Sequence, residues 1–334
     1  MLRRLLAGSV GAFWTVLDSF AGKPAAALDG VETLSDIAYL PDDAGCQSAA
    51  VRRQPKTPQT GRGRFGRSNC HLLDVHRPRC AAGPLPVIVT IHGGGLFYGD
   101  KAQDTAFCQQ FASRGFTVFN LNYRLVPQHS IADQFQDIIA ALNWIQANAA
   151  AHCGDPTRLM LLGESAGGLL ATSIALALND PAFSNRIGVR FANSSPSAPE
   201  SPAPAPKVAA LGLVSPMLRL DEPSYVGLAL RTICFGNTPA EKSLKQALLL
   251  ANLPNLSALP PVFCVSSEQD WLRKMSQAFT ARLRADKAEH TFRFFEKHTG
   301  YRLDHIFPVF HPEYPQSQQA FTELSAFFKS HAPS

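Results

Sequence analysis

A short segment bracketed by glycines, in the middle of the chain, constrains the fold most. It reads GESAG at residues 163–167, with the apolar run 159–162 directly before it and the helix-prone run 169–178 just after it. The glycines omit side chains where the backbone turns tightly and where a strand and a helix approach closely. A strand, sharp turn and helix of this kind hold the central serine in a strained conformation with its hydroxyl exposed. The segment therefore predicts an α/β architecture with Ser165 at the end of a buried strand.

A second glycine-rich segment indicates the chemistry. The apolar run 86–91 reads as a buried strand and leads directly into HGGG at residues 92–95. Glycines after a strand leave backbone N–H groups free to point at an anion, as an oxyanion hole requires. The GESAG pattern alone arises often by chance, but the two segments together predict a serine hydrolase.

The rest of the chain fits a mostly parallel sheet with helices on both faces, because apolar strand-like runs alternate with amphipathic helices past residue 85. Before that point we expect cap helices and then two antiparallel edge strands. Asp155 and Pro156 are expected to break the chain just before the strand that leads to Ser165. The predicted strands cover residues 33–40, 69–77, 86–91, 116–122, 158–162, 207–214, 261–266 and 291–295, and the predicted helices cover 103–114, 133–150, 165–179, 272–287 and 316–330.

We predict one catalytic domain over residues 1–334 with a discontinuous helical cap. The cap would come from about residues 1–40 and from the apolar, helix-prone stretch 216–258. Residues 193–206 are mostly Pro, Ser and Ala, so we expect a disordered-looking surface insertion there. Residues 52–67 carry Lys and Arg without Asp or Glu. A solvated loop is the expectation for this segment, with an electrostatic patch for an anionic partner as the alternative.

A serine hydroxyl needs a base to accept its proton, and the base needs a carboxylate to orient it. In an α/β hydrolase these groups follow in the chain order Ser, acid, His, and the last two lie after late strands. Asp270, after the strand 261–266, and His305, after the strand 291–295, satisfy this order. We therefore predict that Ser165, Asp270 and His305 form a catalytic triad.

Other candidates lie close to these two positions. Glu268 is the nearest rival for the acid, and His298 is a rival for the base because it lies closer to the end of its strand. Asp304 is expected to be a surface or salt-bridging group.

These motifs together resemble the hormone-sensitive-lipase branch of the α/β-hydrolase superfamily, which includes bacterial and plant carboxylesterases. The matching stretches cover residues 85–180 densely and 260–310 more loosely. They are HGGG at 92–95, NYRLVP at 122–127, GDPTR at 154–158 and GESAGG at 163–168.

The resemblance implies the α/β-hydrolase fold and the triad already named. It also implies an oxyanion hole formed by the backbone N–H groups of Gly93, Gly94 and Ala166. Two departures concern the surroundings of the triad. In the loop that contains the acid, Trp271 stands where the family has a proline and Lys274 where it has a second acid. After the histidine, Ile306 stands where the family has a glycine. Neither removes a reacting group, but Trp271 and Ile306 are expected to narrow or reshape the acyl pocket.

The predicted function is hydrolysis of carboxylic esters with short to medium acyl chains. An amidase that resembles arylformamidases is an alternative, although residues 95–97 read Gly-Leu-Phe where those enzymes have a Trp. A lipase, peripheral or secreted, is another alternative. A non-catalytic receptor of the same fold is a further one, since plant relatives of this kind have lost the catalytic His. The presence of Ser165, Asp270 and His305 argues against a receptor.

The expected partner is a small-molecule ester, and a homodimer is possible. We expect no nucleic-acid partner, no membrane span, no metal and no cofactor. Cys70, His71, His76 and Cys80 do not predict a metal site, because a strand at 69–77 spreads Cys70 and His76 over roughly 20 Å. Residues 1–27 read either as a cap helix or as a secretory signal. We expect a cytoplasmic protein in the first case and a secreted or periplasmic one in the second.

Overall fold

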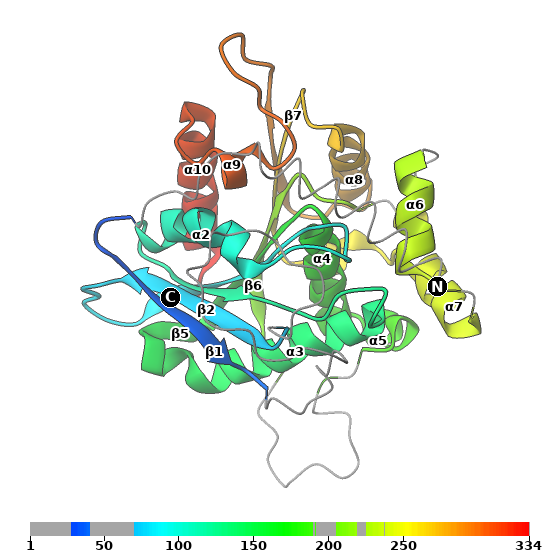
Figure 1. Cartoon of the computed structure of the whole chain (residues 1–334), viewed down its shortest axis with the longest axis horizontal. Coiled ribbons are helices and arrows are strands. Elements are labelled where there is room, and N and C mark those ends of the chain that lie inside the picture. The colour runs from blue at the N-terminus through cyan, green and yellow to red at the C-terminus, as the bar shows by residue number, and fades with distance from the viewer. Residues whose placement is uncertain are drawn as a thin grey trace, which may run out of the picture.

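The fold is built on one eight-stranded sheet with helices on both faces, which confirms the predicted α/β class (Figure 1). The computed structural model describes residues 28–40, 70–189, 191, 205–218, 225–236 and 238–333. The strands are β1 (Val31–Ala38), β2 (Leu72–Pro78), β3 (Leu85–Ile91), β4 (Thr117–Leu121), β5 (Gly154–Glu164), β6 (Val208–Val214), β7 (Val262–Ser267) and β8 (His290–Phe295).

The strands lie in the order β1-β2-β4-β3-β5-β6-β7-β8. β2 runs antiparallel to both β1 and β4, so the two expected antiparallel edge strands are confirmed, and the other neighbouring pairs are parallel. The chain leaves β3 for β4 on one side, whereas β5 lies on the other side of β3. Sheets of this kind bind ligands outside the carboxyl ends of the strands at such a switch point. The segment 92–95 and Ser165 follow β3 and β5, so both lie at this position.

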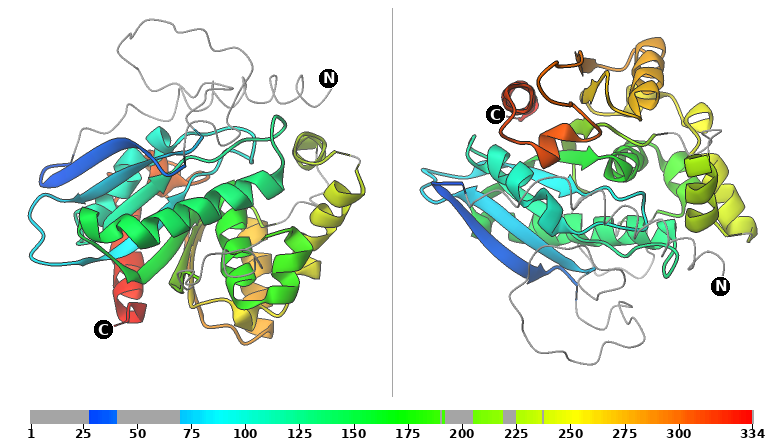
Figure 2. Two further views of the ribbon diagram at one scale, coloured as in Figure 1. Left: turned by 90° about the horizontal axis from the view of Figure 1, so that it is seen from below. Right: turned by 45° about the horizontal axis from the view of Figure 1, so that its top comes forward.

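Helices cover both faces of the sheet. In Figure 1, α2 and α10 lie above β1 and β2, whereas α3 lies below them, and the right-hand view in Figure 2 agrees. The α-helices are α2 (Thr105–Ala112), α3 (Ile131–Asn148), α4 (Ala166–Asn179), α5 (Pro181–Ile187), α6 (Tyr225–Cys234), α7 (Pro239–Ala247), α8 (Arg273–Ala285), α9 (Phe307–Phe310) and α10 (Pro315–His331). Short 3-10 turns are η1 (Lys101–Asp104), η2 (Ala149–His152), η4 (Leu250–Asn252) and η5 (Leu256–Ala258).

The sheet separates two apolar cores, and β3 shows how its strands serve both. Val87, Val89 and Ile91 are fully buried in the core shared with α3, α4 and α8. Ile88, which points to the opposite face, is buried in the core shared with α2 and α10. Because a parallel strand is covered on both sides, it reads as a continuous apolar run, which is why its position could be predicted.

The start of β5 differs from the prediction. The expected break at Asp155 and Pro156 does not end the strand, which already begins at Gly154. Instead the pairing with β3 shifts between Pro86 and Val87, so that Val87 faces Leu159. Residues 156–158 therefore form a bulge in the pairing of β5 with β3. The side chain of Asp155 accepts hydrogen bonds from the N–H and the hydroxyl of Thr157, which stabilises this bulge.

The segments expected to form a cap are described only in part. Residues 1–27 lie outside the described residues, and residues 31–38 form the edge strand β1. The described part of 216–258 contains the helices α6 and α7. The basic segment 52–67 and nearly all of the insertion at 193–206 also lie outside the described residues.

Several properties of the described residues bear on partners. They contain no group of three or more His, Cys, Asp or Glu side chains suited to hold a metal ion. None of their helices is both long and apolar enough to cross a bilayer. Cys70 is disulfide-bonded. The free thiols in this part of the chain are those of Cys80, Cys108, Cys153, Cys234 and Cys264.

Candidate active site

Ser165 lies in a strained turn between β5 and α4. Its φ is +49° and its ψ is −118°, a conformation that L-residues rarely adopt. The turn has no space for larger residues beside the serine. A Cβ on Gly167 would lie 1.9 Å from the carbonyl oxygen of Ile91, and one on Gly163 would lie 2.4 Å from the carbonyl oxygen of Gly167. The two glycines of the motif are therefore required by close backbone contacts.

The chain after β6 holds this turn in place. The Ser165 N–H donates to the carbonyl of Val214 at 3.0 Å, and the Met217 N–H donates to the carbonyl of Ser165 at 2.7 Å. Both main-chain groups of the serine are therefore bound by the neighbouring strand end. This satisfies polar groups that would otherwise be buried without partners.

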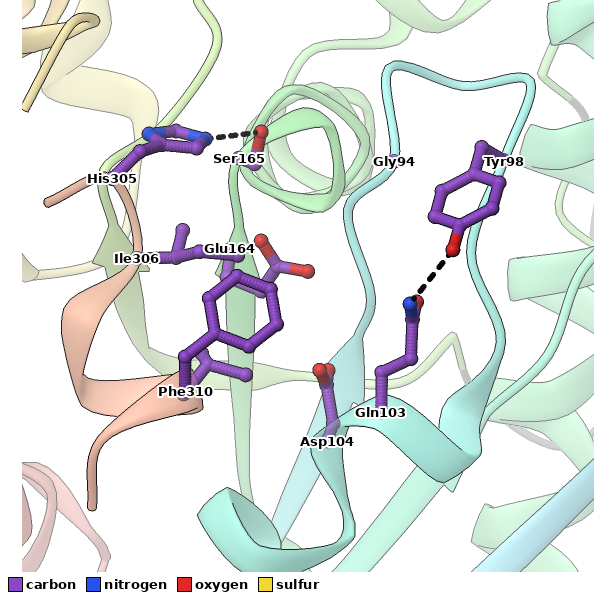
Figure 3. A pocket seen from close by; sticks show the side chains of 10 residues that line it. Gly94, Tyr98, Gln103, Asp104, Glu164, Ser165, His305, Ile306 and Phe310 are labelled. Carbon is purple, nitrogen blue, oxygen red and sulfur yellow. Dashed lines mark hydrogen bonds between the residues drawn. The ribbon is translucent and has the colours of Figure 1, made fainter. Parts of the chain in front are cut away.

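Ser165, His305 and Asp270 come together as the sequence predicts. His305 Nε2 lies 2.9 Å from Ser165 Oγ (Figure 3). His305 Nδ1 lies 2.8 Å from Asp270 Oδ1. An ionised carboxylate only accepts, so Nδ1–H donates to Asp270 and leaves Nε2 to accept the hydrogen bond of the serine hydroxyl.

Asp270 is fully buried just past β7. Its carboxylate also accepts hydrogen bonds from the Leu272 N–H at 2.8 Å and from Ser266 Oγ at 2.9 Å. Burial raises the pKa of Asp270, but the hydrogen bond and charge of His305 and the backbone hydrogen bond of Leu272 outweigh it, so the pKa lies below its ordinary value. The group therefore stays ionised at neutral pH and can orient the imidazole.

The rival residues lie elsewhere. Glu268 accepts from the Lys297 N–H at 3.1 Å. His298 is exposed and stacks on Tyr301 with ring centroids 4.0 Å apart. Asp304 pairs with Arg302 at 2.8 Å on the surface. The structure thus brings Asp270 and His305, and not their rivals, to Ser165.

The two departures from the family pattern flank the imidazole. The Trp271 ring lies 5.0 Å from the His305 ring, centroid to centroid, and the side chain remains 46% exposed. Ile306 lines the same pocket as Ser165. Ile306 therefore borders the site directly and Trp271 borders the imidazole, and their effect on the acyl pocket stays a prediction.

The glycine segment after β3 is held by neighbouring aromatic groups. The His92 ring stacks on the Tyr123 ring with centroids 4.3 Å apart, and the Tyr123 hydroxyl donates to the His92 carbonyl at 2.7 Å. Burial lowers the pKa of His92, so its imidazole stays neutral. His92 Nδ1 lies 2.9 Å from the Gly93 carbonyl and donates to it, since that oxygen can only accept.

One of the three N–H groups expected in the oxyanion hole already has an acceptor within the fold. The Gly93 N–H donates to the side chain of Glu164, the residue before Ser165. Because this single N–H is already bound, Gly93 does not serve as an oxyanion donor in this conformation. Gly94, at φ +92°, lines the pocket beside Ser165. Ala166 is the first residue of α4, so its N–H has no acceptor within the helix.

Gly95 offers a further backbone N–H that the sequence reasoning did not include. Its φ is +61°, and none of the described residues accepts from its N–H. The signal for it was present, because Gly95 is the third glycine of the same HGGG segment. Which two of three consecutive N–H groups face the serine depends on loop dihedrals that the sequence does not reveal.

The pocket above Ser165 contains two acidic side chains that the sequence reasoning also missed (Figure 3). Glu164 occupies the variable position of the GESAG motif, and Asp104 lies at the end of η1. The pocket is a small cavity of about 40 Å³ that opens to solvent. Its lining residues are Gly94, Tyr98, Gln103, Asp104, Glu164, Ser165, His305, Ile306, Val309 and Phe310.

Comparison with known proteins identifies the class. A family model described as the alpha/beta hydrolase fold matches residues 88–300, and the chain belongs to this family. The resemblance to its hormone-sensitive-lipase-like members is confirmed, and named esterases recur among the relatives. The chain is thus an α/β hydrolase, and proteins named as esterases are among those that it resembles.

The curated relatives match over part of their length. Esterase LipC of Mycobacterium tuberculosis is 30% identical over 154 residues, which cover 43% of this chain and 38% of that protein. Versiconal hemiacetal acetate esterase of Dothistroma septosporum is 35% identical over 102 residues, which cover 30% of this chain and 31% of that protein. Each matched segment is therefore less than two fifths of the relative's own length.

Solved structures match over nearly the whole chain. Esterase B of Lactobacillus rhamnosis superposes with a TM-score of 0.76 at 22% identity, covering 98% of this chain and 95% of that chain. At this identity the likeness establishes a common fold.

Proposed function

We propose that this protein hydrolyses carboxylic esters through an acyl-enzyme intermediate on Ser165. The observation that carries the proposal is the continuous hydrogen-bonded relay from Asp270 through His305 to Ser165, with distances of 2.8 and 2.9 Å. A neutral imidazole with its free nitrogen at the serine is the arrangement that activates a hydroxyl nucleophile.

The first half of the reaction forms the acyl-enzyme. Ser165 Oγ attacks the ester carbonyl while His305 Nε2 accepts its proton. The N–H groups of Gly94 and Ala166, with Gly95 as the third donor, stabilise the negative charge on the carbonyl oxygen. Loss of one such donor raises the barrier by about 3 kcal/mol. His305 then protonates the departing alcohol.

The second half releases the acid. Water takes the place of the alcohol, His305 accepts a proton from it, and the resulting hydroxide attacks the acyl carbonyl. Collapse of the second tetrahedral intermediate returns the proton to Ser165. Asp270 remains ionised throughout and stabilises the imidazolium each time it forms.

Hydrolysis of p-nitrophenyl esters tests the proposal. Wild-type protein should release p-nitrophenol from the butyrate ester, and Ser165→Ala should lose this turnover. A fluorophosphonate probe should label Ser165, as located by peptide mass spectrometry. Full turnover in Ser165→Ala, or failure of the probe to label the wild-type protein, would overturn the serine mechanism.

Acyl-chain preference is part of the same proposal. We expect short to medium chains, and p-nitrophenyl esters from acetate to palmitate provide the profile. A maximum at long chains that depends on an oil–water interface would indicate the lipase alternative. Faster hydrolysis of an aryl formamide than of the matching formate ester would indicate the amidase alternative.

We also propose that α6 and α7 belong to a cap over the site. Cys234, the last residue of α6, lies with its Sγ 3.5 Å from the carbonyl oxygen of Gly95 and donates to it. Ile233 and Phe235 are buried in the same core as the glycine loop's neighbour Leu96. Movement of α6 would therefore be transmitted to the proposed oxyanion donors.

The Cys70 disulfide favours the secreted or periplasmic alternative over the cytoplasm, because disulfides form and persist in oxidising compartments. Alkylation without reductant, followed by mass spectrometry of the protein from its native host, tests this. The Cys70 peptide should carry no label until a reductant is added. Full labelling of Cys70 before reduction would favour the cytoplasm. The homodimer remains a prediction, and light scattering, which measures the molar mass in solution, tests it.

A further inference from the structure

Asp104 is a buried acidic residue that does not cap the helix it precedes. It is 1% exposed, and its Oδ2 has no hydrogen-bond partner in the described part of the chain. It occupies the N-cap position of α2, where an Asp normally accepts a backbone N–H of the first turn, yet its side chain makes no cap hydrogen bond. Instead it faces the pocket that contains Ser165 (Figure 3).

Among the described residues, no cation pairs with this carboxylate. Lys101, on the same 3-10 turn, is bound to Asp36 and Asp74 at 2.8 and 2.7 Å. Glu164 adds a second acidic group to the pocket wall, and Figure 3 shows both carboxyl groups facing the same space. An unpaired carboxyl group is costly to bury, so one that persists beside a nucleophile points to a ligand with a complementary group.

The position relative to the triad indicates which part of an ester would meet Asp104. His305 must protonate the departing alcohol, so the alcohol part lies on the imidazole side of Ser165. The pocket wall on that side consists of His305 and the residues that follow it, Ile306, Val309 and Phe310. Asp104 lies in the same pocket, across from this apolar wall.

We propose that Asp104 binds a protonated amino group in the alcohol part of the ester substrate, with Glu164 adding negative potential. This inference rests on the proposed esterase function and names its substrate class, the esters of amino alcohols. The apolar side chains of Val309 and Phe310 would contact the alkyl portion of the alcohol. Asp104 is then a specificity residue that contacts substrate and takes no part in proton transfer.

A pair of esters that differ in one charged group tests the proposal. 2-(Dimethylamino)ethyl butyrate and 3-methylbutyl butyrate have the same shape, but only the first carries an ammonium N–H. Hydrogen bonds to charged groups correspond to about 10-fold or more in binding. We expect wild-type kcat/KM to favour the ammonium ester by about that factor, and Asp104→Asn to bring the ratio close to one.

The control variant is Asp304→Asn. Asp304 is an acidic residue next to His305 in sequence, but its carboxylate is exposed and paired with Arg302. The ratio between the two esters should be unchanged in this variant if contact with Asp104, rather than general negative charge near the site, is responsible. A ratio that falls equally in both variants would overturn the assignment to Asp104.

Inhibition by the free alcohols gives a second measurement that needs no variant. 2-(Dimethylamino)ethanol should inhibit hydrolysis of p-nitrophenyl butyrate by the wild-type protein more strongly than 3-methylbutan-1-ol. Equal inhibition, together with an ester ratio of one in the wild type, would show that the ammonium group is not recognised and would overturn the inference. Absence of p-nitrophenyl butyrate turnover would instead overturn the proposed function, so the two failures are distinguishable.

Discussion

The main-chain N–H of Gly93 donates to the carboxylate of Glu164. This hydrogen bond joins the loop after β3 to the residue directly before the nucleophile. A Cβ on Gly93 would lie 2.5 Å from Glu164 Oε2, so the two segments approach closely as well. The glycine loop and the serine turn are therefore placed relative to each other by a direct contact.

Removal of the Glu164 carboxylate should disturb the oxyanion donors without touching the triad. Glu164→Ala loses the acceptor for Gly93, and we expect kcat for p-nitrophenyl butyrate to fall about 10-fold or more, since a misplaced donor no longer stabilises the oxyanion. Glu164→Gln keeps an acceptor oxygen and should retain more activity. Equal activity of the wild type and Glu164→Ala would contradict this positioning role.

Asp270→Asn should inactivate the enzyme while leaving binding almost intact. The amide cannot hold His305 in the tautomer that leaves Nε2 free, so we expect kcat to fall by about 10³- to 10⁴-fold with little change in KM. Glu268→Gln serves as the matched control, because that carboxylate bonds only to the Lys297 N–H in the described contacts. A larger loss in Glu268→Gln than in Asp270→Asn would reverse the assignment of the acid.

His76 should make the fold sensitive to acid. It is fully buried in β2, with Nδ1 2.9 Å from Thr33 Oγ1, and burial together with the charge of Lys101 lowers its pKa to about 4. An unfolded chain takes up this proton near pH 6.5. The free energy of unfolding should therefore keep its full value above that pH. It should fall by about 3 kcal/mol as the pH drops toward 4, because the unfolded chain then binds a proton that native His76 does not.

Urea denaturation at pH 7 and pH 4.5 measures this effect. In His76→Gln the side chain does not titrate, so the variant should lose less stability between the two pH values than the wild type does. The same loss in both proteins would show that other groups cause the acid sensitivity.

Asp104 should destabilise the fold at alkaline pH. Burial, with a contribution from the charge of Asp100, raises its pKa to about 7. The native state therefore binds a proton between about pH 4 and 7 that the unfolded chain does not, and this stability is lost as the pH rises through 7. Asp104→Asn should raise the free energy of unfolding by about 2–4 kcal/mol at pH 8 and change it little at pH 4. Urea denaturation measures both values. An equal change in the free energy of unfolding at pH 8 and at pH 4 would contradict the raised pKa of Asp104.

Most of the fold could be predicted because its signals are local. The buried strands read as continuous apolar runs, as β3 and β7 show, since both of their faces are covered. Asp270 and His305 could be singled out because they follow late strands in the chain order that the chemistry requires. Their side-chain geometry adds what sequence order could not supply, namely that Glu268 and His298 point to other partners.

The parts that could not be predicted depend on tertiary placement. Asp104 falls inside the expected helix 103–114, where it reads as an ordinary polar residue. In the structure it lies at the change from η1 to α2 and lines the pocket. The direction of the Gly93 N–H likewise depends on dihedral angles within a run of three glycines. A contact with Glu164, 71 residues away, decides it.

The sheet that separates the two cores also separates the parts that stabilise the fold from the connections proposed to bind and react with substrate. The strands and the layers on either side supply rigidity, while the groups proposed to react or to recognise substrate lie at or just past the carboxyl ends of β3, β5, β7 and β8. Sequence change in those few connections can alter what is recognised without disturbing either hydrophobic layer. One scaffold of this design can therefore diversify its substrates at little risk to folding.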